Sequence, residues 1–126
     1  MKKIISTSNA PAAIGPYAQA NFANGVLYIS GQIPVDPSTG KLVEGIEKET
    51  HQVMKNLQAI LTEAGMSFRN VVKASIFLKS MDDFAVMNEI YASYLEEGSY
   101  PARETVQVSC LPKNVDIEIS MIAHAD

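Results

Sequence analysis

The last quarter of the chain alternates between apolar and polar residues, and this alternation constrains the fold more than any other feature. Two runs, 101–109 and 115–121, flank a turn at 111–114 that contains a proline. Because the side chains of a β-strand point to opposite faces in turn, the runs predict two strands joined as a hairpin. The residues expected on its core face are all apolar: Val106, Val108, Val115, Ile117, Ile119 and Met121.

The opposite face of this predicted hairpin is polar. Its residues are Arg103, Thr105, Gln107, Ser109, Asp116, Glu118 and Ser120. A sheet needs only one apolar face to form a core, so this face is free for solvent, a ligand or another subunit. Arg103 can hold a carboxylate through two parallel hydrogen bonds, and Glu118 can activate a water molecule. The alternative, which the pattern alone slightly favours, is that both side chains form surface ion pairs.

The first third of the chain predicts three strands and an ordered loop. Residues 3–7 form a short strand, and residues 9–16 form a loop with two prolines and a glycine. The dipeptide Asn24-Gly25 is the strongest hairpin signal in the chain, and it joins strands at 17–22 and 26–30. This turn brings three candidate site residues to one corner: Tyr17, Ser30 and Gly31.

The middle of the chain predicts two helices separated by a strand. Apolar residues recur at helical spacing from 46 to 64, and residues 71–78 are rich in β-branched and aromatic side chains. Ser80 caps a second helix that ends near residue 96. Asn88 falls in the apolar stripe of this helix, so it is either a satisfied core amide or a site residue. The order β-β-β-α-β-α-β-β predicts an α+β fold, with both helices on one face of a mixed sheet.

Composition and charge narrow the classes of function. A length of 126 residues predicts one domain, residues 1–126, and the net charge of −4 with scattered lysines and arginines disfavours nucleic-acid binding. The single cysteine, Cys110, fits a reducing cytoplasm, and no segment predicts a signal peptide or a membrane span. His51 and His124 have no ligand-type residues at metal spacing, so no metal site is expected.

Short motifs spread over the whole chain carry a family resemblance. They include Ala12-Ala13-Ile14-Gly15-Pro16-Tyr17, Ile29-Ser30-Gly31-Gln32-Ile33-Pro34, Met87-Asn88-Glu89, Pro101-Ala102-Arg103, Leu111-Pro112-Lys113 and Ile117-Glu118-Ile119. Together they resemble the signature of the RidA (YjgF-type) family, the reactive enamine/imine deaminases. The resemblance implies a chorismate-mutase-like α+β fold, assembled as a homotrimer with ligand sites between subunits.

The resemblance also implies an activity and the residues that perform it. The family hydrolyses reactive 2-imino acids, such as 2-iminobutanoate and 2-iminopropanoate, to 2-oxo acids and ammonia, uses no cofactor and thereby limits metabolite damage. By position, Arg103 would bind the substrate carboxylate and Glu118 would position the attacking water. The residues implied to line the pocket are Tyr17, Ser30, Gly31, Asn88 and Thr105.

Three positions depart from the family pattern and leave the substrate range open. Glu104 stands where a small residue is usual, so its carboxylate must reach solvent or a cation. Thr105 stands where cysteine is common, and Ser120 where an acidic residue is frequent. The first alternative function is a non-catalytic regulatory protein that binds small carboxylic acids. The second is an RNA-cleaving or translation-inhibiting protein, against which the acidic net charge argues.

The predicted hairpin also raises a question of distance. If the turn at 111–114 closes a simple hairpin, Glu118 faces Gln107, and Arg103 lies four residues further on, roughly 13 Å away at the strand rise. One small ligand cannot easily contact both side chains across that distance. We therefore expect Arg103 and Glu118 of different subunits to meet at one site.

Overall fold

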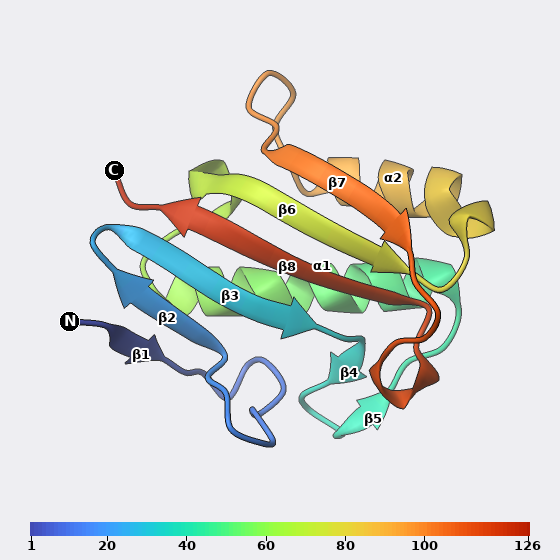
Figure 1. Cartoon of the computed structure of the whole chain (residues 1–126), viewed down its shortest axis with the longest axis horizontal. Helices are drawn as coiled ribbons and strands as arrows, with labels where there is room; N and C mark the ends of the chain where they lie inside the picture. The colour runs from blue at the N-terminus through green and yellow to red at the C-terminus, as the bar shows by residue number, and fades with distance from the viewer.

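A six-stranded sheet carries two helices on one face in the computed structural model, which describes residues 1–126 (Figure 1). In spatial order, the strands are β1 (Lys3–Ile5), β2 (Ala20–Ala23), β3 (Val26–Gln32), β8 (Ile117–His124), β6 (Val71–Leu78) and β7 (Ala102–Gln107). The helices are α1 (Ile46–Glu63) and α2 (Phe84–Ser93), and β4 (Val35–Asp36) pairs with β5 (Lys41–Leu42) in a separate ribbon. Short 3₁₀ turns are η1 (Phe68–Asn70), η2 (Met81–Asp83) and η3 (Pro112–Asn114).

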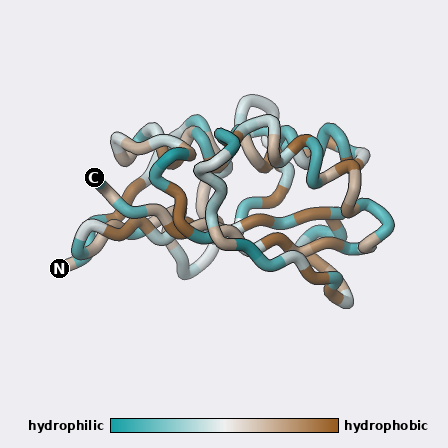
Figure 2. The backbone as a smooth tube through the Cα atoms, turned by 90° about the horizontal axis from the view of Figure 1, so that it is seen from above, coloured by the Kyte–Doolittle hydropathy of each residue, from teal (hydrophilic) through white to brown (hydrophobic).

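The predicted α+β fold is confirmed, and its sheet is mixed. Only β6 and β7 run parallel; every other neighbouring pair is antiparallel. Seen along the sheet edge, the backbone separates into a layer of helical turns and a layer of extended strands (Figure 2). Neither α-helix is apolar and long enough to cross a membrane.

The local turn and cap signals of the sequence are confirmed. Asn24 and Gly25 both have positive φ, 50° and 79°, and join β2 to β3. The N–H of Ser30 donates to the carbonyl of Gln19 at 2.9 Å, so this turn places Gln19 opposite Ser30. Ser80 accepts a hydrogen bond from the N–H of Asp82. The second helix is shorter than predicted, because η2 forms its first turn and α2 ends at Ser93.

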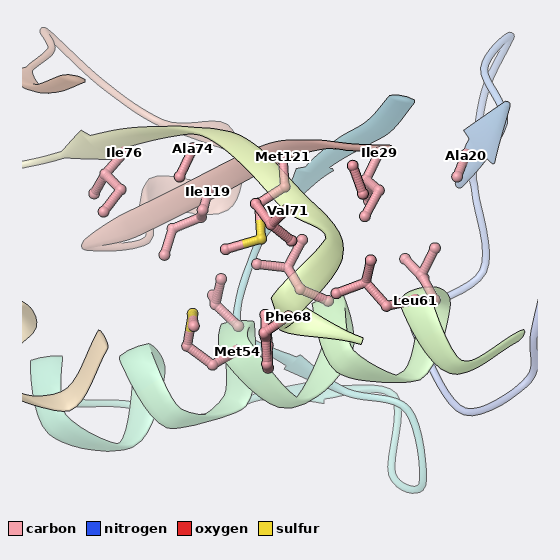
Figure 3. Close-up of a cluster of buried hydrophobic side chains, with 14 of the residues drawn as sticks. Ala20, Ile29, Met54, Leu61, Phe68, Val71, Ala74, Ile76, Ile119 and Met121 are labelled. Atoms are coloured by element: carbon pink, nitrogen blue, oxygen red, sulfur yellow. The ribbon is translucent and has the colours of Figure 1, made fainter. Parts of the chain in front are cut away.

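The core lies between the sheet and α1. Side chains of Ile119 and Met121 point from the sheet towards Met54 and Leu61 of α1 (Figure 3). These four side chains are at most 2% exposed. The strict alternation of β8 therefore buries one of its faces completely, as its sequence predicts.

The predicted hairpin between residues 101–109 and 115–121 is wrong. β7 pairs with β6, in parallel, and β8 pairs with β6 and β3, so β6 lies between the two strands of the expected hairpin. The turn at 111–114 is the 3₁₀ turn η3, in which Lys113 and Asn114 have positive φ. The chain reaches β7 from β6 through α2, the usual helical crossover between parallel strands. A local turn signal shows that two strands follow each other in the chain, but it does not specify that they are neighbours in the sheet.

The orientation of β7 also differs from the prediction. Arg103 pairs with buried Ala74, and Thr105 pairs with buried Ile76, so both face the helices. Val106 pairs with Phe77 on the uncovered face and is 42% exposed. The expected apolar and polar faces are thus exchanged on β7. The register between β7 and β6 determines this orientation. The alternation of residues within β7 does not specify that register.

Candidate functional site

Arg103 lies against one face of α2. Its Nη1 donates to Oδ1 of Asn88 at 2.7 Å. Its Cζ lies 5.6 Å from the ring centroid of Phe84 and 5.2 Å from that of Tyr91. Asn88 is therefore paired with the charged side chain of a candidate site residue, and its amide is not simply satisfied within the core. A guanidinium has five N–H donors, so one bond to Asn88 leaves others for a ligand.

The free edge of β7 adds further hydrogen-bond donors beside Arg103. The N–H of Val108 donates to the carbonyl of Leu78 at 2.9 Å. Because N–H groups alternate in direction along a strand, the N–H of Thr105 points away from β6, towards the open edge. The hydroxyl oxygen of Thr105 is buried and has no hydrogen-bond partner. A guanidinium, an edge N–H and a hydroxyl together suit a carboxylate.

Glu118 lies on the uncovered face of the sheet, paired with Phe77. Its carboxylate covers Gly31: a Cβ added to that glycine would overlap Oε2 of Glu118 and lie 2.8 Å from Cδ. Gly31 belongs to an irregularity of β3, where the register with β8 shifts between Ile29 and Gln32. Burial raises the pKa of Glu118 above its ordinary value. This carboxyl is thus less readily ionised than a solvated one, which suits a proton acceptor.

Ser30 precedes Gly31 in β3, whereas Tyr17 lies in the loop that leads to β2, which begins only at Ala20. The hydroxyl of Ser30 donates to the carbonyl of Ala18 at 2.6 Å, and the ring of Tyr17 is 53% exposed. Buried Gln19 holds the loop before β2: its amide nitrogen donates to the carbonyl of Pro11 at 2.8 Å. The loop is therefore anchored, while Tyr17 remains open to contact a ligand or another chain.

The candidate residues form two separate groups in one chain. Arg103, Asn88 and Thr105 lie on the helix side of β7. Ser30, Gly31 and Glu118 lie at β3 and β8, with Glu118 on the opposite face of the sheet. Arg103 and Glu118 are therefore separated within one chain, but the predicted reason, their positions along a simple hairpin, is wrong.

Glu104 reaches a cation, one of the two alternatives predicted from its sequence position, and it is also exposed to solvent. Its Oε1 lies 2.9 Å from Nζ of Lys73, and Oγ of Ser75 donates to its Oε2. The hydrogen bond from Ser75, followed by that from Lys73, lowers the pKa of this carboxyl. The cross-strand pairs Ser75–Glu104 and Ser75–Ser120 place this polar cluster in one row on the uncovered face.

Phe84 and Tyr91 also contact Arg103, although the sequence alone indicates only that they belong to the apolar stripe of the second helix. Their spacing predicts a shared helix face, but no signal within the sequence of α2 indicates that an arginine of β7 contacts that face. No three His, Cys, Asp or Glu side chains gather as a metal-binding group. Two surface hollows, of about 360 and 420 Å³, lie beside the C-terminal half of α1 and contain none of the candidate residues.

The chain belongs to the family described as Endoribonuclease L-PSP, whose sequence model matches residues 7–125. This is the RidA (YjgF-type) family that its motifs resemble, so that prediction is confirmed. A RutC family protein of Pyrococcus horikoshii is 54% identical over 127 residues, with 100% of both chains covered.

Two further relatives bear on function. A Mus musculus protein named 2-iminobutanoate/2-iminopropanoate deaminase is 50% identical, over 98% of this chain and 91% of its own length. The crystal structure of Escherichia coli TdcF with bound serine has a TM-score of 0.94 and 40% identity, over 98% of this chain and 99% of that one. Because relatives carry different names, these likenesses establish the family rather than one activity.

Proposed function

We propose that the protein hydrolyses 2-imino acids, such as 2-iminobutanoate and 2-iminopropanoate, to 2-oxo acids and ammonia. The observation that carries this proposal is the environment of Arg103, whose guanidinium donates one hydrogen bond to Asn88 and has further N–H donors for a carboxylate. The deaminase name of the mouse relative and the serine bound to the E. coli relative support a small ligand of the amino-acid type.

The reaction needs a held substrate, a water molecule and a proton acceptor. Arg103 binds the substrate carboxylate and thereby places the C=N carbon. Water attacks this carbon of the protonated imine (C=NH2⁺) while Glu118 takes one of the water protons, which forms a neutral carbinolamine. Glu118 then returns this proton to the amine nitrogen, the C–N bond breaks, and ammonia leaves as the hydroxyl oxygen forms the C=O bond and gives its remaining proton to Glu118, which releases it to solvent. An imine is already electrophilic, so positioning and one oriented water can suffice without a cofactor.

The site requires more than one chain in this proposal. Arg103 and Glu118 lie on opposite faces of the sheet, and the uncovered face has exposed apolar side chains, among them Tyr28, Val72 and Val106. A homotrimer would cover this face and bring the Glu118 group of one subunit to the Arg103 group of its neighbour. The pocket would include Tyr17, Ser30, Gly31, Asn88 and Thr105.

The proposed setting is the cytoplasm, with removal of reactive imines as the role. The exposed free thiol of Cys110 fits a reducing compartment. An enzyme of this kind acts after reactions that release 2-imino acids into solution, where the imines are free to attack other proteins.

The test is an Arg103→Ala variant assayed on imine generated in situ from an amino acid. We expect loss of nearly all acceleration of 2-oxo acid and ammonia release, because a methyl group cannot hold the carboxylate. The matched control is Arg69→Ala, which removes an exposed arginine paired with Glu96 at 3.5 Å. Full activity in a correctly folded Arg103→Ala protein would refute the assignment.

A non-catalytic protein that binds small carboxylic acids is the second candidate. The serine bound to the E. coli relative favours binding as much as it favours turnover. Turnover of imine by the purified protein separates the two functions, whereas binding of 2-oxobutanoate is expected of both.

A further inference from the structure

Three side chains of α2 converge on the guanidinium of Arg103. Phe84, Asn88 and Tyr91 are spaced at i, i+4 and i+7, so they share one face of the helix. Asn88 accepts one N–H at 2.7 Å, and both ring centroids lie within the roughly 6 Å range of cation–π attraction. A single helix face thus supplies a hydrogen bond and two aromatic contacts to one charged group.

Tyr91 contacts Arg103 with its ring, and its hydroxyl has no polar partner. Tyr91 is 4% exposed, yet its hydroxyl is buried without a hydrogen-bond partner. Burial raises the pKa of this hydroxyl, and the charge of Arg103 acts in the opposite direction. Thr105, on the same side of β7 as Arg103, also has a buried hydroxyl without a partner. Unpaired polar atoms are therefore concentrated in the residues around this guanidinium.

We propose that Phe84 and Tyr91 are positioning residues, which hold the Arg103 guanidinium in the orientation that receives a ligand carboxylate. The proposal deepens the proposed function, because it rests on Arg103 as the carboxylate-binding group. An arginine side chain has several rotatable bonds, and binding a ligand through it ordinarily restricts them. Two aromatic contacts and the Asn88 hydrogen bond restrict them before the ligand arrives.

This arrangement predicts a particular kinetic signature. Once substrate is bound, the carboxylate itself holds the guanidinium, so loss of one ring weakens binding more than it slows the chemical step. KM should therefore rise while kcat changes little. A variant that is merely less well folded behaves differently, because it lowers the apparent kcat and leaves KM unchanged.

The experiment compares Phe84→Leu, Tyr91→Leu and Tyr91→Phe with the wild-type protein. Calorimetry with 2-oxobutanoate measures affinity, imine turnover gives KM and kcat, and NMR of the Arg103 Nε–H reports ring-current shift and solvent exchange. We expect either leucine variant to weaken 2-oxobutanoate binding by about 2- to 30-fold and to shift the Nε–H signal. Tyr91→Phe restores the ring and most of the affinity. The control is Val86→Ala, at a residue of α2 that is 37% exposed.

Each outcome decides the proposal. Unchanged affinity and an unchanged Arg103 signal in the leucine variants would overturn it. If Tyr91→Leu fails to fold, Phe84→Leu decides alone, since Phe84 is only half-buried. A wild-type protein that binds 2-oxobutanoate but does not hydrolyse imine refutes the deaminase and leaves the positioning role intact. A wild-type protein that does not bind 2-oxobutanoate refutes the positioning role.

Discussion

Position 31 needs a glycine because the carboxylate of Glu118 fills the space of a side chain there, and not because of its backbone conformation. It lacks the positive φ that favours glycine elsewhere in this chain, such as at Gly25 and Gly40. A side chain at position 31 would occupy the space of the Glu118 carboxyl. The irregularity of β3 brings this backbone close to β8 and so determines where Glu118 can lie.

Replacing Gly31 with alanine should therefore impair activity more than stability. The added methyl group displaces the carboxylate of Glu118, and a small displacement of a catalytic group lowers kcat/KM by roughly 10- to 100-fold. Imine turnover and urea unfolding of Gly31→Ala measure the two effects.

A double variant provides the control. Because Gly31 acts through Glu118, adding Gly31→Ala to Glu118→Gln should cause little further loss. Additive losses in the double variant would contradict this role.

The ionisation of Glu118 should be visible in the pH dependence of activity. Burial raises its pKa, and only the carboxylate form accepts a proton from water. Activity is therefore lost as pH falls through a midpoint above the ordinary value of 4.5. The pH profile of kcat/KM, compared with that of Glu118→Asp, measures this midpoint. A midpoint at or below 4.5 would contradict the prediction.

At the scale of elements, buried polar groups connect α1 to segments that border the six-stranded sheet, in addition to the packing of its apolar stripe. Asn56 donates to the carbonyls of Ile33 and Val35 at 3.2 and 3.0 Å. Glu49, 4% exposed, accepts hydrogen bonds from the N–H of Asp116 at 2.8 Å and from that of Gly45 at 3.2 Å. Glu49 therefore connects the start of α1 to the segment that leads into β8.

This connection should depend on pH. Burial, followed by the neighbouring Asp116 carboxyl, raises the pKa of Glu49 from 4.5 to about 7. A raised folded-state pKa means that the folded protein binds the proton more tightly than the unfolded chain. The resulting stabilisation is complete below about pH 4.5 and is lost as pH rises through about 7.

Glu49→Gln tests this dependence, because glutamine stays neutral at every pH. Relative to the wild type, the free energy of unfolding of the variant should rise by about 1–2 kcal/mol between pH 5 and pH 8, after allowance for solvent screening. Urea unfolding at several pH values measures it. The control is Glu47→Gln, at an exposed residue on the same helix. Parallel pH curves for Glu49→Gln and the wild type would contradict the prediction.

At the scale of the whole molecule, the sheet itself separates the two halves of the proposed site. One chain supplies Arg103 on the helix side of β7 and Glu118 on the other side of the sheet. A ligand that contacts both must therefore lie between chains. In the proposed homotrimer, closed rotational symmetry would repeat this contact between each pair of neighbouring chains.

Mixing inactive Arg103→Ala and Glu118→Ala chains should restore activity. A site then needs Arg103 from one chain and Glu118 from its neighbour, so an equal random mixture recovers about a quarter of wild-type sites. Imine turnover after unfolding and joint refolding measures the recovery, and each variant refolded alone is the control. No recovery in mixed trimers verified by native mass spectrometry would show that the site lies within one chain.

Short-range signals predicted most elements of this fold. The turn at Asn24 and Gly25 was predictable because its φ angles depend on the residues themselves. Both helices were predictable from periodicity, and the alternation of β8 specified its buried face. Arg103 and Glu118 were candidates because both were predicted on the polar face of the sheet, but only Glu118 lies on the uncovered face, and Arg103 faces the helices.

The tertiary structure alone decided where β7 lies and what surrounds Arg103. The backbone of a strand can pair with any neighbour, so its sequence does not contain its partner. Placing β6 between β7 and β8 turned Arg103 towards α2, where Phe84, Asn88 and Tyr91 contact it. The sequence by itself thus determined the elements and the chemical groups of this protein. Long-range pairing determined which face each group occupies, because only the assembled sheet fixes the register between strands.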